Sequence, residues 1–328
     1  MTTVQEIEKA VKGHWQSALF SIENSKVSRR GKVRDIIERG DVLYLINTDR
    51  VSAFDHVLGT IPLKGALLCE QAEFWFNFSR GICLNHLVDR PDPQILVCKK
   101  AQALPIEVIV RGYLAGSLMR EKPEVRGHSY GLKLDPNLKN YQALETPIIT
   151  PTTKAPQGAH DEPISRAEII GRNLVQEHHW QEIEDIALAL FNSCANQARK
   201  SGLLLVDTKY EFGLINDKIH LIDEVHTSDS SRFFMEADYQ EKFPINATPT
   251  MLDKEYLRQR LIENGVNPNT SDALDITLDE ELRIEVAKRY FMLTEKITGR
   301  TFNAPSLGAK TRVHEAILRL CPFHSTNH

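Results

Sequence analysis

The sequence of 328 residues lacks the long apolar segments that mark membrane proteins and secreted precursors. No run reaches the roughly 18 consecutive apolar residues of a membrane span. The first residues, MTTVQEIEKAVKGHW, mix acidic, basic and apolar side chains at helical spacing, without the apolar core or the cleavage site of a signal peptide. We therefore expect a cytoplasmic protein with no membrane partner.

Cysteine and net positive charge are also scarce. The five cysteines are odd in number and form no C-x-x-C pair, so they signal neither a disulfide framework nor a thiolate zinc site. We expect reduced, mostly buried thiols. Lys and Arg number 40 against 44 Asp and Glu, which gives a formal net charge of −4. Because no global positive field exists to gather nucleic acid, no such partner is expected and any anion must be bound locally.

The length corresponds to roughly two domains of ordinary size, and no repeat or low-complexity tract is present. The first third is rich in short β-branched runs. Runs at 33–37 and 42–47 predict a hairpin, and further strands are expected at 95–98 and 106–110. The apolar pattern of 66–78 predicts a helix. This region is therefore expected to form a small sheet with one helix.

The rest of the chain alternates helical and extended patterns. Helices are predicted at 180–200, 255–264 and 280–298, and strands at 203–214 and 219–223. Gly202 is placed to cap the first of these helices, and Gly299 to end the last. The proline-containing stretch 146–163 is too long for a simple turn, which favours a functional loop over a linker. Residues 303–328 have a weak helical pattern and are interpreted as an appendage.

Charged residues alternate along the strand predicted at 203–214. Side chains two residues apart share a face of a strand, so Asp207, Lys209 and Glu211 should project together. The partner strand ends at Asp223. A three-residue turn between the strands would place Asp223 opposite Glu211, whereas a two-residue turn would place it opposite Tyr210. We choose the three-residue turn.

Two carboxylates directly opposite each other on a sheet repel, by up to about 1 kcal/mol. A cation between them would remove that cost. Oxygen ligands without nearby His or Cys suit Mg²⁺, which binds one or two carboxylates together with substrate phosphates. A solvated sheet face with alternating charges is the other interpretation of the same pattern.

Three further segments carry groups suited to phosphate. Gly31, Lys32 and Arg34 lie at the first predicted hairpin but lack the spacing of a Walker A loop. The segment from Arg111 to Ser117 combines a guanidinium fork, glycines and a hydroxyl. Ser230 and Ser231 precede Arg232, shortly after Asp223 in the sequence. A solvated basic patch, ordinary turns and structural ion pairs are the alternative interpretations.

Taken together, these segments closely resemble the SAICAR synthetase family (phosphoribosylaminoimidazole-succinocarboxamide synthases) in its single-domain form. The matching strings are GKVRD at 31–35, TDRVSAFD at 48–55, PIEVIVRGYLAGS at 105–117, TPTTKAPQGAHDEPIS at 150–165, LLLVDTKYEFG at 203–213 and IDEVHTSDSSRFF at 222–234. They occur in the family's order and, with the helices between them, cover about residues 15–300.

The resemblance implies an ATP-dependent carbon–nitrogen ligase of purine biosynthesis. Such enzymes join L-aspartate to 5-amino-1-(5-phosphoribosyl)imidazole-4-carboxylate (CAIR), giving SAICAR, ADP and phosphate, by way of an acyl phosphate. The implied cofactors are ATP and Mg²⁺. By resemblance, the catalytic residues are Asp207 and Lys209, the cofactor-binding residues are Gly31, Lys32, Arg34, Glu211 and Asp223, of which Glu211 and Asp223 hold the metal, and the substrate-binding residues are Arg111, Ser117, Asp161, Ser231 and Arg232.

The fold implied by the resemblance is α+β and similar to protein kinases and ATP-grasp enzymes. It consists of a small antiparallel β-rich lobe at 1–105 and a larger lobe at 106–302, with the nucleotide in the cleft and an extension at 303–328. The protein is expected to be a monomer or a small homo-oligomer. A small-molecule kinase and a nucleotide-binding module without catalysis are the competing functions. A second anion site, at Arg111, Ser117 and Arg232, argues against a kinase. The presence of all four charged residues Asp207, Lys209, Glu211 and Asp223 argues against a module without catalysis.

Overall fold

The computed structural model describes residues 1–23, 27–54, 56–154, 161–266, 276 and 278–321. The chain forms two compact units built from discontinuous segments. The first unit contains 1–73, 87–100 and 253–328, and the second contains 74–86 and 101–252. The functional division at 105 and 302 stays a prediction.

The first unit contains most of the small β-rich sheet expected from the sequence, but the strand expected at 106–110 is part of β8 (Gln102–Tyr113) and belongs to the sheet of the second unit. The five antiparallel strands of the first unit follow the order β1-β2-β3-β7-β6, and β4 and β5 form a separate pair. The elements of this unit are α1 (Val4–Gly13), β1 (Arg29–Arg30), β2 (Arg34–Arg39), β3 (Val42–Asn47), β4 (Arg50–Ala53), β5 (His56–Thr60), α2 (Lys64–Ser79, which continues into the second unit), β6 (Leu87–Asp92), β7 (Ile95–Lys99), α7 (Lys254–Glu263), α8 (Glu280–Thr298) and α9 (Ala309–Leu320).

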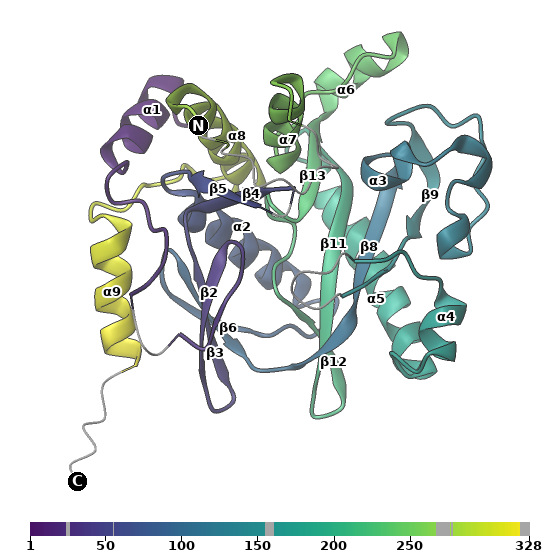
Figure 1. The fold of residues 1–328 in the computed structure, drawn as a ribbon, viewed down its shortest axis with the longest axis horizontal. Helices are drawn as coiled ribbons and strands as arrows, with labels where there is room; N and C mark the ends of the chain where they lie inside the picture. The colour runs from purple at the N-terminus through teal and green to yellow at the C-terminus, as the bar shows by residue number, and fades with distance from the viewer. Residues whose placement is uncertain (24–26, 55, 155–160, 267–275, 277, 322–328) are drawn as a thin grey trace. The chain divides into compact units, whose positions relative to one another are not determined.

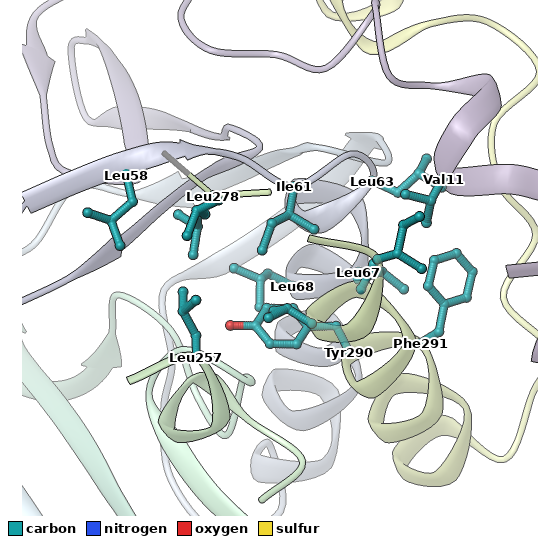
Figure 2. Packing of buried hydrophobic residues seen from close by; sticks show 14 of the residues in the cluster. Val11, Leu58, Ile61, Leu63, Leu67, Leu68, Leu257, Leu278, Tyr290 and Phe291 are labelled. Carbon is teal, nitrogen blue, oxygen red and sulfur yellow. The ribbon is translucent and has the colours of Figure 1, made fainter. Parts of the chain in front are cut away.

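The core of this unit joins the two ends of the chain. Figure 2 shows Val11 of α1, Leu67 of α2, Leu257 of α7 and Tyr290 of α8 in one buried cluster. These residues come from the first eighty and the last eighty positions, so both regions of the sequence contribute to the core of this unit.

Helix α9 belongs to a second buried cluster of the same unit. Val313 and Ile317 of α9 pack there with Ile37 and Ile46 of the five-stranded sheet. The region expected to be an appendage thus contains, in its described part 303–321, a helix that packs into the core of the first unit. Its apolar residues recur at helical spacing, but only the tertiary structure shows which surface they cover.

The second unit is built on a six-stranded antiparallel sheet. The path β10-β8-β11-β12 is extended by β13, which pairs with β11, and by β9, which pairs with β8. Strand β11 is the long central strand of this unit in Figure 1. The elements are β8 (Gln102–Tyr113), α3 (Gly116–Arg120), η1 (Pro123–Val125), η2 (His128–Tyr130), β9 (Ala143–Ile149), β10 (Thr152–Thr153), α4 (Arg166–Gly171), α5 (Glu177–Arg199), β11 (Leu203–Ile215), β12 (Lys218–Ile222), β13 (Ser231–Met235), α6 (Glu236–Lys242) and η3 (Phe243–Ile245).

The predicted helices and strands are confirmed, with small shifts at their ends. Helix α8 ends at Gly299, whose φ of 68° is the left-handed conformation of a C-cap. Gly202 also has a positive φ, 70°, but it lies two residues beyond the C-cap of α5, which is Lys200. The predicted functional loop at 146–163 contains β10, and its residues 155–160 lie outside the described residues.

The hairpin of β11 and β12 turns over two residues, not three. Asn216 and Asp217 have φ values of 50° and 59°, as a two-residue type I′ turn requires. As a result Glu211 lies opposite Ile222, and Asp223 comes one residue later, beyond the paired part of β12. The predicted register is therefore wrong. The Asn–Asp pair accepts the left-handed conformation, and this preference decides the length of the turn.

In the part of the chain that the structure describes, no helix is both long enough and apolar enough to cross a membrane.

Candidate functional site

Strands β8 and β11 bring charged side chains from distant parts of the sequence to one face of the sheet. Their antiparallel register pairs Asp207 with Arg111 and Glu211 with Glu107. On the other side of β11, the register with β13 shifts by one residue between Leu205 and Asp207. After that shift Asp207 lies opposite Arg232 as well. Bulges of this kind re-aim side chains and are common beside active sites.

Asp207 is the centre of an arginine cluster, which we define as Asp207, Arg111, Arg232 and Ser117. Its Oδ2 accepts hydrogen bonds from Arg111 Nη1 at 3.2 Å and from Arg232 Nη1 at 2.8 Å. The side chains of Asp207 and Arg111 are 4% and 2% exposed, whereas Arg232 is 19% exposed. The cluster holds two guanidinium groups and one carboxylate. Its net positive charge faces solvent chiefly through Arg232.

Arg111 is held on all sides by the protein. Its Nε donates to Thr150 Oγ1 at 2.8 Å, Nη1 also donates to the carbonyl of Ala115 at 3.1 Å, and Nη2 donates to Ser117 Oγ at 2.9 Å. Burial lowers the pKa of Arg111, and the carboxylate of Asp207 opposes that effect. Arg111 therefore orients Ser117 and Asp207, and Ser117 is itself exposed.

Gly116 leaves room for both guanidinium groups. A Cβ atom at this position would lie 2.7 Å from Arg232 Nη1 and 3.1 Å from Arg111 Nη1. Its φ of 63° also lies in the left-handed region, which residues other than glycine rarely adopt. The packing of the arginine cluster therefore requires glycine at position 116.

Further along the same face lies a lysine cluster, which we define as Lys209, Lys154, Glu107 and Glu211. Lys209 Nζ is 2.6 Å from Glu107 Oε1 and 2.9 Å from Glu211 Oε1. Lys154 pairs with the other oxygen of Glu211. Thr152 Oγ1 donates to Glu107 Oε2 at 3.3 Å.

The carboxylates keep Lys209 protonated. Burial alone would lower its pKa, but Glu211, Glu107 and Asp223 together raise the pKa of Lys209 above its usual value. Burial raises the pKa of Glu107, and Lys209 works against that shift. Lys209 is therefore a fixed positive charge and is unsuited to act as a base at neutral pH.

The donor set of this region fits a magnesium ion that also binds phosphate. Glu211 and Asp223 are carboxylates that would supply oxygen ligands, and both raise the pKa of Lys209. Three carboxylates, those of Glu211, Glu107 and Asp223, raise the pKa of Lys209, and Lys154 pairs with Glu211. Asp161 is exposed and contributes to the raised pKa of Glu107. Within the described residues, no group of three or more His, Cys, Asp or Glu side chains is arranged to hold a metal ion. Mg²⁺ needs only one or two protein carboxylates when substrate phosphates complete its shell.

The opposite face of β11 carries a buried polar network behind these charges. Tyr210 Oη lies 2.9 Å from His226 Nε2, and the hydroxyls of Thr208 and Ser231 are 2.7 Å apart. Ser231 Oγ also lies 3.4 Å from His226 Nδ1. Ser231, which we expected at the substrate, is 5% exposed, and its hydroxyl lies within this network. Its assignment as a substrate ligand stays a prediction.

The turn before β2 contains the expected nucleotide residues of the first unit. Gly31 and Lys32 are exposed between β1 and β2, and Arg34 is the first residue of β2. The Gly31 N–H donates to the carbonyl of Arg34 at 2.7 Å, which closes the turn.

Our prediction of the site did not include Glu107 and Lys154. Glu107 has a signal in the sequence, because Glu107, Ile109 and Arg111 alternate and must share a face of one strand. Lys154 has no such local signal. Its contact with Glu211 joins residues 57 positions apart, and only the tertiary structure brings them together.

The sequence is similar to those of known proteins. The family model described as SAICAR synthetase matches residues 27–272. The phosphoribosylaminoimidazole-succinocarboxamide synthase of Legionella pneumophila (strain Paris) is 40% identical over 279 residues, covering 83% of this chain and 88% of that protein. The chloroplastic enzyme of the same name from Arabidopsis thaliana is 41% identical over 307 residues, covering 92% of this chain and 73% of that protein.

Solved structures agree. The SAICAR synthase of Saccharomyces cerevisiae, determined in complex with SAICAR, superposes with a TM-score of 0.74 at 32% identity and covers 86% of this chain and 98% of its own. The mixed α+β fold is thus confirmed. This chain belongs to the SAICAR synthetase family.

The buried His226 predicts a specific loss of stability in acid. Burial lowers the pKa of His226 from 6.5 to about 3. Between these values the unfolded chain binds a proton that the folded chain does not, so stability falls as the pH drops below 6.5. At about pH 5 this costs about 2 kcal/mol.

We expect His226→Asn to reduce the acid sensitivity by about this amount, since Asn accepts the positive φ of 47° at this position. Urea unfolding at about pH 7.5 and about pH 5, followed by the fluorescence of Trp75 and Trp180 in the same unit, measures the difference. Equal pH dependence in the two proteins would refute the assignment of a neutral, buried histidine.

Proposed function

We propose that the arginine cluster and the lysine cluster form the substrate end and the reacting end of the active site of a SAICAR synthetase. As a member of this family, the chain is a carbon–nitrogen ligase that joins CAIR and L-aspartate in purine biosynthesis. The observation that carries the residue assignments is the face of β8 and β11. It carries the two guanidinium groups around Asp207, and about 13 Å further along the strand the carboxylates and lysine around Glu211.

We propose ATP as the source of activation. A carboxylate is a poor electrophile, so its oxygen first takes the γ-phosphoryl group of ATP and ADP leaves. The amine of L-aspartate then attacks the carbonyl carbon of the acyl phosphate, inorganic phosphate departs, and the nitrogen loses a proton to solvent. Positioning and charge neutralisation are the main requirements of phosphoryl transfer.

The arginine cluster suits the phosphate of CAIR. Arg232 and Ser117 are the accessible donors, and charge-assisted hydrogen bonds to phosphate are among the strongest in proteins. Asp207 and Arg111 are buried and hold these two groups in place. In this proposal Asp207 is a positioning residue. Asp161, which we expect to bind substrate, is exposed and close enough to Glu107 to raise the pKa of that carboxyl group.

Lys209 supplies a positive charge beside the reacting groups. Its raised pKa keeps the ammonium group protonated, so it can stabilise negative charge on the transferring phosphoryl group. Glu107 and Glu211 hold that ammonium group between them. We therefore assign Lys209 an electrostatic role and not that of the base.

The remaining assignments concern the nucleotide. Glu211 and Asp223 would hold Mg²⁺, which neutralises phosphate charge when bound. Lys154 and Lys209 already offset part of the charge of Glu211. Lys32 and Arg34 would contact the phosphates through their side-chain donors, and Gly31, whose N–H closes the turn, would let the backbone come close to them.

The reaction itself tests the proposed function. Purified protein with Mg-ATP should form ADP and SAICAR in equal amounts, and only when CAIR and L-aspartate are both present. The measurement is ADP release by a coupled assay together with SAICAR by chromatography. Equal ADP release without L-aspartate would instead support a kinase, and absence of product under every condition would reject the ligase.

The metal assignment is tested by Asp223→Asn. Loss of a carboxylate ligand should raise the Mg²⁺ concentration required for half-maximal activity by about tenfold or more, with an unchanged circular dichroism spectrum. Asp229→Asn is the matched control, because it removes the same charge from the same loop. If both variants keep the wild-type Mg²⁺ dependence, Asp223 is not a ligand.

A further inference from the structure

Arg50, the first residue of β4, is a buried arginine that contacts the nucleotide turn of the same unit. Its side chain is 6% exposed. Its Nη2 donates to the carbonyl of Gly31 at 2.9 Å, and its Nε donates to the carbonyl of Lys32 at 2.8 Å. A third donor, Nη1, reaches the carbonyl of Phe20. One guanidinium group therefore holds two successive carbonyls of the turn.

A neighbour of Arg50 holds the next carbonyl. The hydroxyl and the N–H of Thr48 donate to the carbonyl of Val33 at 2.7 Å and 3.1 Å. The three successive carbonyls of the turn are thus bound from the segment Thr48–Arg50. The matched string TDRVSAFD contains this segment, but none of its residues was expected at the site.

The carboxylate of Asp35 balances the charge of Arg50. Asp35 is fully buried, and its Oδ1 accepts from Arg50 Nη2 at 2.8 Å while its Oδ2 accepts from the Ile22 N–H at 3.0 Å. A buried ion pair adds little net stability compared with apolar side chains. Its better-attested use is to specify one geometry.

The geometry specified here concerns the N–H groups of the turn. A trans peptide is planar, and its N–H points opposite to its C=O. Because the carbonyls of Gly31 and Lys32 point toward Arg50, the N–H groups of Lys32 and Val33 point away from it. Gly31 and Lys32 are both exposed. Successive N–H groups directed to one side make a binding site for anions.

We propose that Arg50 is a positioning residue for the nucleotide, which directs the N–H groups of Lys32 and Val33 toward the phosphates of ATP. This inference rests on the proposed function and names what shapes its phosphate-binding turn. Lysine could not replace Arg50, because one ammonium group does not reproduce the planar fork that spans two carbonyls.

The test removes Arg50 and its counter-charge together, as Arg50→Met with Asp35→Asn, so that no buried charge is left unpaired. We expect the KM for ATP to rise by about tenfold and the KM for CAIR to stay within about twofold. Arg50→Lys should also raise the KM for ATP. If the KM for ATP is unchanged in both variants, the inference is overturned.

A matched control separates positioning from general stability. Arg90 of the same unit, whose side chain is 12% exposed, pairs with Glu70 at 2.6 Å and with Glu73 at 2.7 Å. Arg90→Met with Glu70→Gln should lower the unfolding midpoint without changing either KM. An equal rise of the KM for ATP in both double variants would make the effect of Arg50 merely structural and contradict the proposal.

Lys32→Ala distinguishes this inference from the proposed function. If Lys32→Ala raises the KM for ATP and the Arg50 variants do not, the turn binds the nucleotide but Arg50 does not position it. If Lys32→Ala has no effect, the assignment of the turn to the nucleotide fails, and the inference fails with it. Should the Arg50 variants not fold, Thr48→Val removes one hydroxyl contact. It should raise the KM for ATP about threefold, and an unchanged value would overturn the inference.

Discussion

The carboxylate of Asp207 lies between two guanidinium groups from the strands on either side of β11. Removing one partner of such a buried ion pair typically costs about 3–5 kcal/mol, because the remaining charge is left without compensation. This constraint fixes how β8, β11 and β13 pair around Asp207. The shift of register between β11 and β13 is needed for it, and Gly116 leaves the space in which the two arginines meet.

The other charges of the site follow from the same strand. Two residues along, Lys209 faces the same way as Asp207 and is held by Glu107 and Glu211. The alternate residues Thr208 and Tyr210 face the buried network around His226. Strand β11 thus has a charged face, which carries the residues of the proposed reaction, and an opposite face that is neutral and packs into the buried network. In the turn of the first unit, the buried ion pair of Arg50 and Asp35 likewise holds the carbonyl of Gly31, and we propose that it thereby sets the direction of the N–H groups that follow.

The sequence predicted the parts of this arrangement that depend on periodicity. Alternation along 203–214 placed Asp207, Lys209 and Glu211 on one face, and helical spacing located α5 and α8. It failed where the outcome depends on turn geometry or distant packing. The conformations of Asn216 and Asp217 decide the position of Asp223, and the packing of α9 depends on strands some 270 residues earlier in the chain. The contact between Lys154 and Glu211 belongs to the same group, because no local pattern encodes it.

The central claim is that the arginine cluster binds the phosphate of CAIR. Steady-state kinetics of Arg232→Ala test it most directly, because Arg232 is the accessible guanidinium while Arg111 still pairs with Asp207. Arg199→Ala, which removes an exposed arginine of the same unit, is the control. We expect Arg232→Ala to raise the KM for CAIR by about tenfold or more and to leave the KM for ATP nearly unchanged. A larger rise in the KM for ATP than in the KM for CAIR would contradict the claim.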